Sequence, residues 1–167
     1  MTDEANLALL LVRVVVGVSM AAHGWNKATS LEGTAGWFDS IGMRPGRIHA
    51  RLAAGGEILA GLFLAVGLLT SFASLGFVGL MTVAWYTSHR SAGFFIIKAG
   101  WEYVMVLAVI AITIAMLGPG EWSLDSAIGI AADLDGYVGL AISAGGGTLA
   151  AAALLALCFR PPPASTN

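Results

Sequence analysis

Charged residues are scarce in this sequence of 167 residues. Asp, Glu, Lys and Arg make up only 11% of it, whereas 57% is hydrophobic and the mean hydropathy is +0.83. Soluble domains carry roughly 25% charged residues. So little polar surface cannot cover a water-soluble globule, and the composition therefore predicts an integral membrane protein. The net charge of -2, without a basic stripe, argues against nucleic-acid binding.

Cysteine is almost absent as well. Cys158 is the single cysteine, which excludes an intramolecular disulfide and a CxxC pair, so the chain cannot run dithiol chemistry alone. The sequence also lacks a glycine-rich phosphate loop and a nucleophile motif. It opens "MTDEANLALLLVRVVVG", with acids where a signal peptide carries positive charge, so we interpret the first apolar run as a retained helix.

Five apolar runs approach the length of about 20 residues that a transmembrane helix needs. We expect an all-α membrane bundle in one domain, with a hinge at "SFAS" after the second span and a disordered tail over 160–167. The Gly-rich stretch 145–147 predicts a kink or a close helix contact in the last span. The predicted spans are residues 7–25, 52–70, 72–89, 101–117 and 137–159.

Lysine and arginine fall on one side of this arrangement. The loop over residues 118–136 carries only acids, and Arg13 lies within the first span, where it either extends outward or reaches into the bundle. The positive-inside rule then predicts a multi-pass protein with the N-terminus outside and the C-terminus in the cytoplasm. The seven basic residues on the predicted cytoplasmic side are Lys27, Arg44, Arg47, Arg51, Arg90, Lys98 and Arg160.

Ionisable residues from four predicted helices converge at one depth, in the cytoplasmic third of the bundle. They are His23, Lys27, Glu57, His89 and Glu102. His23 and Lys27 are four residues apart and share a helix face. Glu57 lies about 9 Å inside its span, where an unpaired carboxylate is costly, so we expect it to pair with His23, Lys27 or Arg13.

A ligand pocket is one interpretation of this convergence, and its apolar walls would come from aromatic residues at the same level. The alternatives are interfacial solvation of Lys27, His89 and Glu102, and an ion pair that only fixes helix packing. A metal or haem site is not favoured, because no ExxH or HExxH spacing occurs and no histidine lies deep in the bundle. The aromatic candidates are Trp25, Trp85, Tyr86 and Trp101.

Four stretches, in their order along the chain, resemble the DoxX family of small bacterial membrane proteins. They are "LVRVVVGVSMAAHGWNK", "GGEILAGLFLAVGLLT", "GWEYVMVLAVIAI" and "LGPGEWSLD". The resemblance implies a compact four-helix core in the bacterial plasma membrane, to which this chain adds a fifth span. The positions that match the family pattern are Arg13, His23, Lys27, Glu57 and Glu102.

The resemblance also implies two functions. Relatives include the membrane subunit of a thiosulfate:quinone oxidoreductase, and others resemble membrane partners of redox or oxidative-stress assemblies. The chain is therefore expected to be an accessory or anchoring subunit of such a complex that contacts lipid, protein partners and quinone. Alternatively it is the quinone-reactive subunit, with His23 bonded to a quinone carbonyl and Glu57 or Glu102 exchanging protons. A transporter is less favoured, because no internal repeat occurs.

Overall fold

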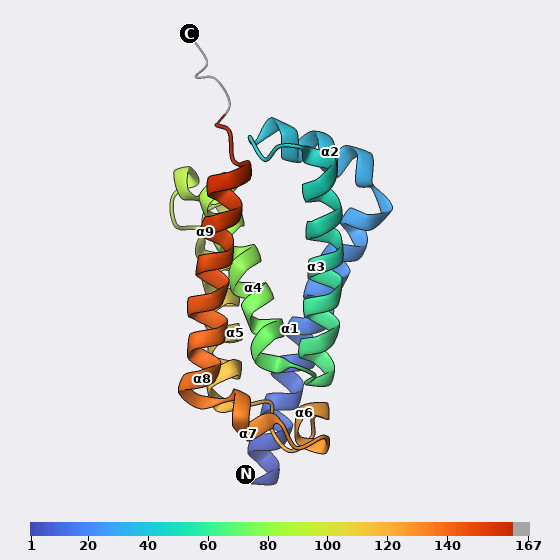
Figure 1. Cartoon of the computed structure of the whole chain (residues 1–167), viewed down its shortest axis with the longest axis vertical. Helices are drawn as coiled ribbons and strands as arrows, with labels where there is room; N and C mark the ends of the chain where they lie inside the picture. The colour runs from blue at the N-terminus through green and yellow to red at the C-terminus, as the bar shows by residue number, and fades with distance from the viewer. Residues whose placement is uncertain (162–167) are drawn as a thin grey trace.

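The long elements of this protein are helices that run along one axis. A computed structural model describes residues 1–161, and within them the chain forms no β-strand, which confirms the all-α bundle. Figure 1 shows the long segments side by side, with the N-terminus at one end and the end of the last helix at the other. They include α1 (Asp3–Thr29), α3 (Gly46–Val66), α4 (Thr70–Ala84) and α5 (Glu102–Leu117).

Two of the long segments contain a π-helical turn. α4 continues through η1 (Trp85–His89), and α8 (Gly136–Leu140) continues through η4 (Ala141–Gly146) into α9 (Gly147–Cys158). By length and composition, the segments Asp3–Thr29, Gly46–Val66 and Gly136–Cys158 can cross a membrane, and Glu102–Leu117 is a shorter apolar helix. These helices make the chain a membrane protein, while five crossings remain a prediction.

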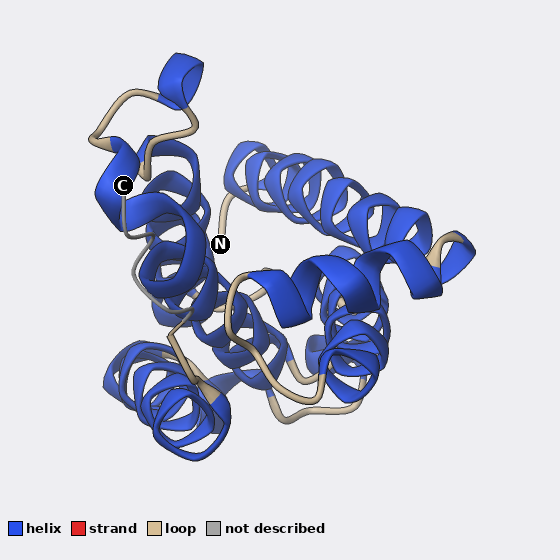
Figure 2. Cartoon of the chain, turned by 90° about the horizontal axis from the view of Figure 1, so that it is seen from above, coloured by secondary structure: helices blue, strands red, loops and turns tan. Residues whose placement is uncertain are grey.

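The short elements gather at the two ends of the bundle. One end, here called the basic end, carries α2 (Leu31–Ser40), η2 (Arg90–Ala92) and η3 (Ile96–Lys98). Viewed from above, α2 lies across the helices beneath it (Figure 2). The other end, the acidic end, carries the N-terminus, α6 (Leu124–Ala127) and α7 (Ala131–Leu134) (Figure 1). The basic loops and the acidic loop thus lie at opposite ends, the separation on which the predicted orientation depends.

Glycines let α1 and α3 approach each other closely. A Cβ atom on Gly17 would lie 2.4 Å from the backbone oxygen of Gly61, and one on Gly24 would lie 2.7 Å from the backbone oxygen of Ala54. Gly56 faces open space instead. Small residues at such a seam bring two backbones into contact in a membrane protein, and here they set the position of α3 against α1.

The helix boundaries differ from the sequence prediction around the second span. α3 begins at Gly46 and ends at Val66, and α4 begins at Thr70. The turn between them uses Gly67, whose φ of 66° gives the left-handed cap that commonly ends a helix. The predicted "SFAS" hinge is therefore wrong, because residues 71–74 belong to α4.

The end of the chain also departs from the prediction. Arg160, predicted to begin the disordered tail, donates its backbone N–H to the oxygen of Gly42 at 2.7 Å. Residues 162–167 lie outside the described residues. The Gly-rich stretch of the last span shows the predicted close helix contact, since a Cβ on Gly147 would lie 2.8 Å from the oxygen of Leu75, and Gly145 and Gly146 belong to a π turn.

Several fully buried hydrophobic side chains lie toward the acidic end. Leu64 near the end of α3, Phe77 in α4 and Ile114 near the end of α5 are at most 2% exposed and belong to one hydrophobic cluster. Toward the basic end, space is left between the helices beneath α2. The fold therefore places a buried hydrophobic cluster next to a cavity.

Candidate ligand cavity

A cavity of about 510 Å³ lies among α1, α3, α4, α5 and α9, on the α2 side of the bundle. Its volume falls within the range of about 300–1,000 Å³ that is usual for small-molecule sites. Most of its wall is aliphatic, and ionisable side chains interrupt it at a few points. Apolar walls with a few convergent polar groups are typical of a ligand site.

Four of the five predicted cluster residues line this cavity, namely His23, Lys27, Glu57 and His89. Lys27 Nζ lies 2.7 Å from Glu57 Oε2, and Glu57 is only 7% exposed. The predicted contact between Glu57 and a basic residue of the first helix is thus confirmed. Gly24 lies one turn before Lys27, and its close approach to α3 places the two side chains within reach of each other.

The two histidines of the predicted cluster have different surroundings. His23 is exposed and has no hydrogen-bond partner among the described residues. His89 Nδ1 lies 2.6 Å from the backbone oxygen of Ala99, so one ring nitrogen is already engaged. His23 therefore has both ring nitrogens available to a ligand in the cavity, whereas His89 has one.

Glu102 lies elsewhere. Among the described residues it is not part of the cavity wall, and its carboxylate instead accepts a hydrogen bond of 3.1 Å from the backbone N–H of Ile96. The loop before α5 folds back onto the first turn of that helix, and this turns the carboxylate toward the loop. The structure therefore does not bring Glu102 to the described cavity wall with Glu57.

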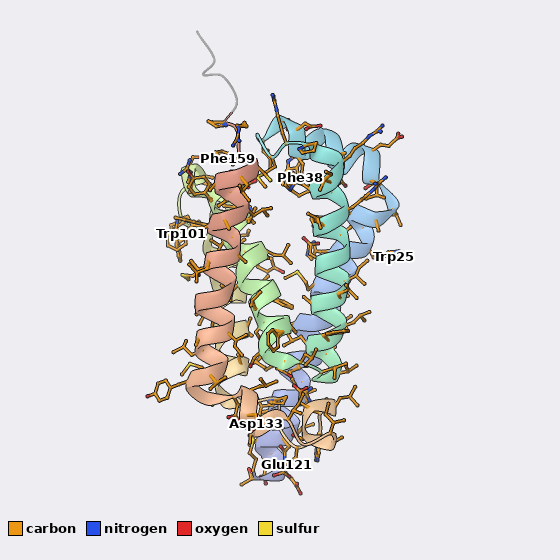
Figure 3. All side chains as sticks on the ribbon, in the orientation of Figure 1. Trp25, Phe38, Trp101, Glu121, Asp133 and Phe159 are labelled. Carbon is orange, nitrogen blue, oxygen red and sulfur yellow. The ribbon has the colours of Figure 1, made fainter. Side chains whose placement is uncertain are left out.

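The aromatic walls were also predicted from the wrong residues. Trp25 is 67% exposed and lies on the outer side of the bundle (Figure 3). Trp85 and Tyr86 line a separate groove of about 420 Å³ beside α9. Trp101 packs against Phe94, with ring centroids 4.8 Å apart. Similar depth along a helix does not fix the direction of a side chain, which is why these four fail.

Aromatic rings at the cavity come mainly from α2. Trp37 and Phe38 line it from this helix, and Tyr103 adds a ring from α5. Figure 3 shows Phe38 beneath α2, on the side of the bundle interior. The sequence does not show that this segment folds back over the helix ends.

His49 is a cavity residue that the sequence analysis did not identify. It is 3% exposed, and within residues 1–161 its Nε2 atom has no hydrogen-bond partner. His49, Ala53 and Glu57 all line the cavity. Their spacing of four residues places them on one face of α3, which is the signal that could have found His49. It went unused because the second span was predicted to begin at residue 52, with His49 in a loop.

Arg13 reaches into the bundle rather than to the outer surface. It is fully buried, and its Nη2 donates to the backbone oxygen of Trp122 at 2.7 Å. Nearby, the Asp125 carboxylate accepts hydrogen bonds from the backbone N–H groups of Leu69 and Thr70 at 2.7 and 2.8 Å. These contacts fasten the acidic loop to the first turn of α4, so Arg13 has a structural place away from the cavity.

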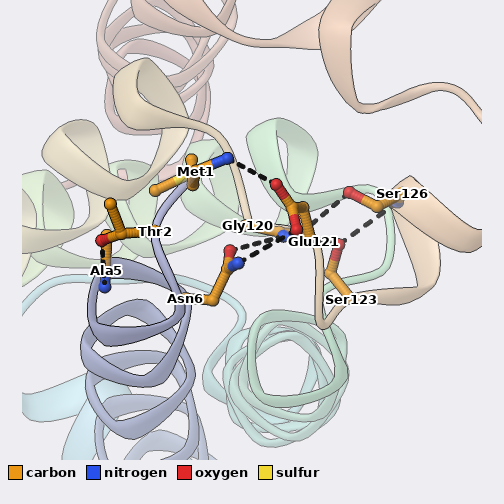
Figure 4. Close-up of polar contacts among 8 residues, drawn as sticks. All are labelled: Met1, Thr2, Ala5, Asn6, Gly120, Glu121, Ser123 and Ser126. Atoms are coloured by element: carbon orange, nitrogen blue, oxygen red, sulfur yellow. Dashed lines mark hydrogen bonds and ion pairs between the residues drawn. The ribbon is translucent and has the colours of Figure 1, made fainter.

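The N-terminal turn also contacts the acidic loop, at Glu121 (Figure 4). Asn6 donates to the Glu121 carboxylate at 3.2 Å and accepts from its backbone N–H at 2.9 Å. The N-terminal ammonium also contacts Glu121. The hydrogen bond and positive charge of this group, with the bond from Asn6, lower the pKa of Glu121.

Among residues 1–161, no three His, Cys, Asp or Glu side chains gather to hold a metal ion.

The fold and the cavity define a small helical membrane protein with a ligand-sized space near one end. The DoxX family model matches residues 8–90, from α1 to the turn after η1. The region that matches the DoxX model includes His23, Lys27, Glu57 and His89. Glu102 and the fifth long segment lie beyond the matched residues.

Two relatives show similarity over most of their length. An uncharacterized protein of Haemophilus influenzae is 26% identical over 132 residues, which cover 74% of this chain and 85% of the relative. A Bacillus subtilis protein named "Putative oxidoreductase CatD" is 29% identical over 125 residues, which cover 75% of this chain and 90% of the relative. No solved structure matches the chain.

Proposed function

We propose that this chain is an accessory membrane subunit of an oxidoreductase complex and that its cavity holds a quinone. The observation that carries the proposal is the cavity itself, in which His23, His49 and Glu57 interrupt an apolar wall. The name of the Bacillus subtilis relative supports a redox setting. The bilayer location gives a lipid-soluble ligand direct access to the bundle.

The lining fits the chemistry of a quinone. A quinone ring is flat and apolar on its faces and carries two carbonyl oxygens that accept hydrogen bonds. Trp37, Phe38 and Tyr103 offer ring faces or edges for packing, and a histidine N–H can donate to a carbonyl. The buried Nε2 atom of His49 has no protein partner among residues 1–161, which agrees with a ligand oxygen at this place.

The residues of this chain would bind and orient the ring and hold protons near it. Reduction of a quinone consumes two electrons and two protons. The electrons would come from a partner protein of the complex, and the titratable groups at the cavity include His23, His49, His89 and the Lys27–Glu57 pair. General acid–base groups within hydrogen-bond reach of the reacting oxygen are the usual means of such proton transfer.

A second function is anchoring without a ligand. The observation that favours it is the Lys27–Glu57 pair, which is satisfied within the chain and joins α1 to α3. Buried ion pairs often fix the arrangement of helices without any chemistry. In this case the chain would organise a redox partner at the membrane, and the cavity would hold lipid.

A titration with decylubiquinone distinguishes the two functions. The protein is purified in a mild detergent, and quenching of tryptophan fluorescence is followed, with Trp37→Phe to show which signal comes from the cavity. We expect saturable binding that His23→Ala weakens and that Asn26→Ala, an exposed neighbour on α1, leaves unchanged. No saturable binding by the wild-type chain would reject quinone binding and leave the anchoring function.

A further inference from the structure

His49 combines burial with an unused polar atom. Its side chain is 3% exposed, yet within residues 1–161 nothing accepts from or donates to its Nε2 atom. Buried polar atoms in folded proteins are nearly always hydrogen-bonded, and each exception calls for a reason. Since His49 lines the cavity, a ligand atom there is the partner that the surroundings allow.

The other ionisable group that α3 contributes to the cavity wall is already engaged. Glu57 is bonded to Lys27, and it lies eight residues beyond His49, or about 12 Å along the helix axis. Ala53, between them on the same face, offers only a methyl group. Of the ionisable side chains that α3 contributes to the cavity wall, the one without a partner is thus His49, which lies nearer the start of the helix.

Aromatic rings lie beside His49. The Phe38 ring centroid is 6.1 Å from that of His49, and Trp37 packs on Phe38 with centroids 4.9 Å apart. The opposite part of the cavity wall is aliphatic, with Leu80 and Leu107 from α4 and α5. A ring with an oxygen substituent therefore fits near α2, and an aliphatic chain fits toward the middle of the bundle.

We propose that His49 is the residue that recognises the ligand, by a hydrogen bond between Nε2 and a ring oxygen. The ring lies beneath α2 beside Phe38, and the tail points toward Leu80 and Leu107. This inference rests on the proposed quinone function and adds which residue selects the ligand and how the ligand is oriented. His49 is a binding residue in this scheme, and the Lys27–Glu57 pair lies deeper.

The test compares two probes that differ in their oxygen atoms. Decylubiquinone carries ring carbonyls, and decylbenzene has the same tail without them. We expect His49→Phe to weaken decylubiquinone binding by tenfold or more and to leave decylbenzene binding within about twofold of wild type. His49→Gln, which keeps an N–H donor, should retain most of the affinity for decylubiquinone.

The outcomes separate this inference from the proposed function. If the wild-type chain binds no decylubiquinone, both are rejected. If the wild-type chain and His49→Phe bind decylubiquinone equally, the role of His49 is rejected and quinone binding stands.

A second measurement covers the case in which His49→Phe does not fold. The ¹⁵N signal of His49 Nε2 in the wild-type chain, assigned with His49→Gln, should shift on addition of decylubiquinone and not on addition of decylbenzene. An unchanged or identical response to the two probes would overturn the proposal.

Discussion

Lys27 at the end of α1 and Glu57 in α3 form an ion pair with 2.7 Å between Nζ and Oε2, at the wall of the cavity. The close approach of Gly24 to the backbone of Ala54 brings α1 and α3 together near this pair, so that the two side chains can meet. The pair thus belongs both to the α1–α3 seam and to the cavity, and its loss should affect the stability of the bundle before it affects any ligand.

Lys27→Met is expected to destabilise the protein by about 3 kcal/mol, because it leaves the Glu57 carboxylate buried without a partner. Thermal unfolding of the purified protein in detergent measures the effect. The double variant Lys27→Met/Glu57→Met should recover most of the stability, since it removes the charge as well. Equal stability of Lys27→Met and wild type would show that Glu57 is solvated or protonated rather than paired.

The glycine seam allows a matched comparison on one helix. Gly61→Ala places a methyl group against the α1 backbone, and overpacking of this kind costs about 1–3 kcal/mol. Gly55→Ala, on the same helix, meets open space and should be neutral or stabilising by up to about 1 kcal/mol through helix propensity. Melting temperatures of the two variants, measured together, test this; a higher value for Gly61→Ala than for Gly55→Ala would contradict the seam.

Much of the fold could be predicted from composition and pattern. The apolar runs predict the long helices, and the cost of an unpaired carboxylate in lipid correctly predicts a basic partner for Glu57. Four-residue spacing also carried the information for His49, but the predicted start of the second span excluded it. A boundary error of six residues, between 46 and 52, was enough to hide the most buried polar residue of the cavity wall.

Other parts of the site depend on tertiary contacts that the sequence does not display. Depth along a helix is readable, but the direction of Trp25 or the fold-back of α2 over the cavity is set by packing between elements. Glu102 illustrates the same limit, since the loop that turns its carboxylate toward Ile96 is irregular. The inward direction of Arg13 likewise follows from the acidic loop that covers it.

Asp125 should be the most sensitive residue of the acidic loop. Its carboxylate accepts two backbone N–H groups at the start of α4, so Asp125→Ala removes a helix cap and should cost about 2 kcal/mol. Asp133, an exposed residue of the same loop, is the control. Asp133→Ala is expected to change the melting temperature little, and similar losses in both variants would argue against the cap.

The orientation of the chain can be tested with single cysteines in a Cys158→Ala background. Ala127, exposed in the acidic loop, and Ser91, exposed at the basic end, are the two positions. The positive-inside rule places the loops that carry Lys and Arg in the cytoplasm. An impermeant thiol reagent added to intact cells should therefore label Ala127→Cys and spare Ser91→Cys, and both should react after the membrane is permeabilised. Because α6 and η2, which carry these positions, lie at opposite ends of the bundle (Figure 1), labelling of Ser91→Cys alone would invert the orientation. Labelling of both in intact cells would contradict the arrangement in which the helices between these positions cross the membrane.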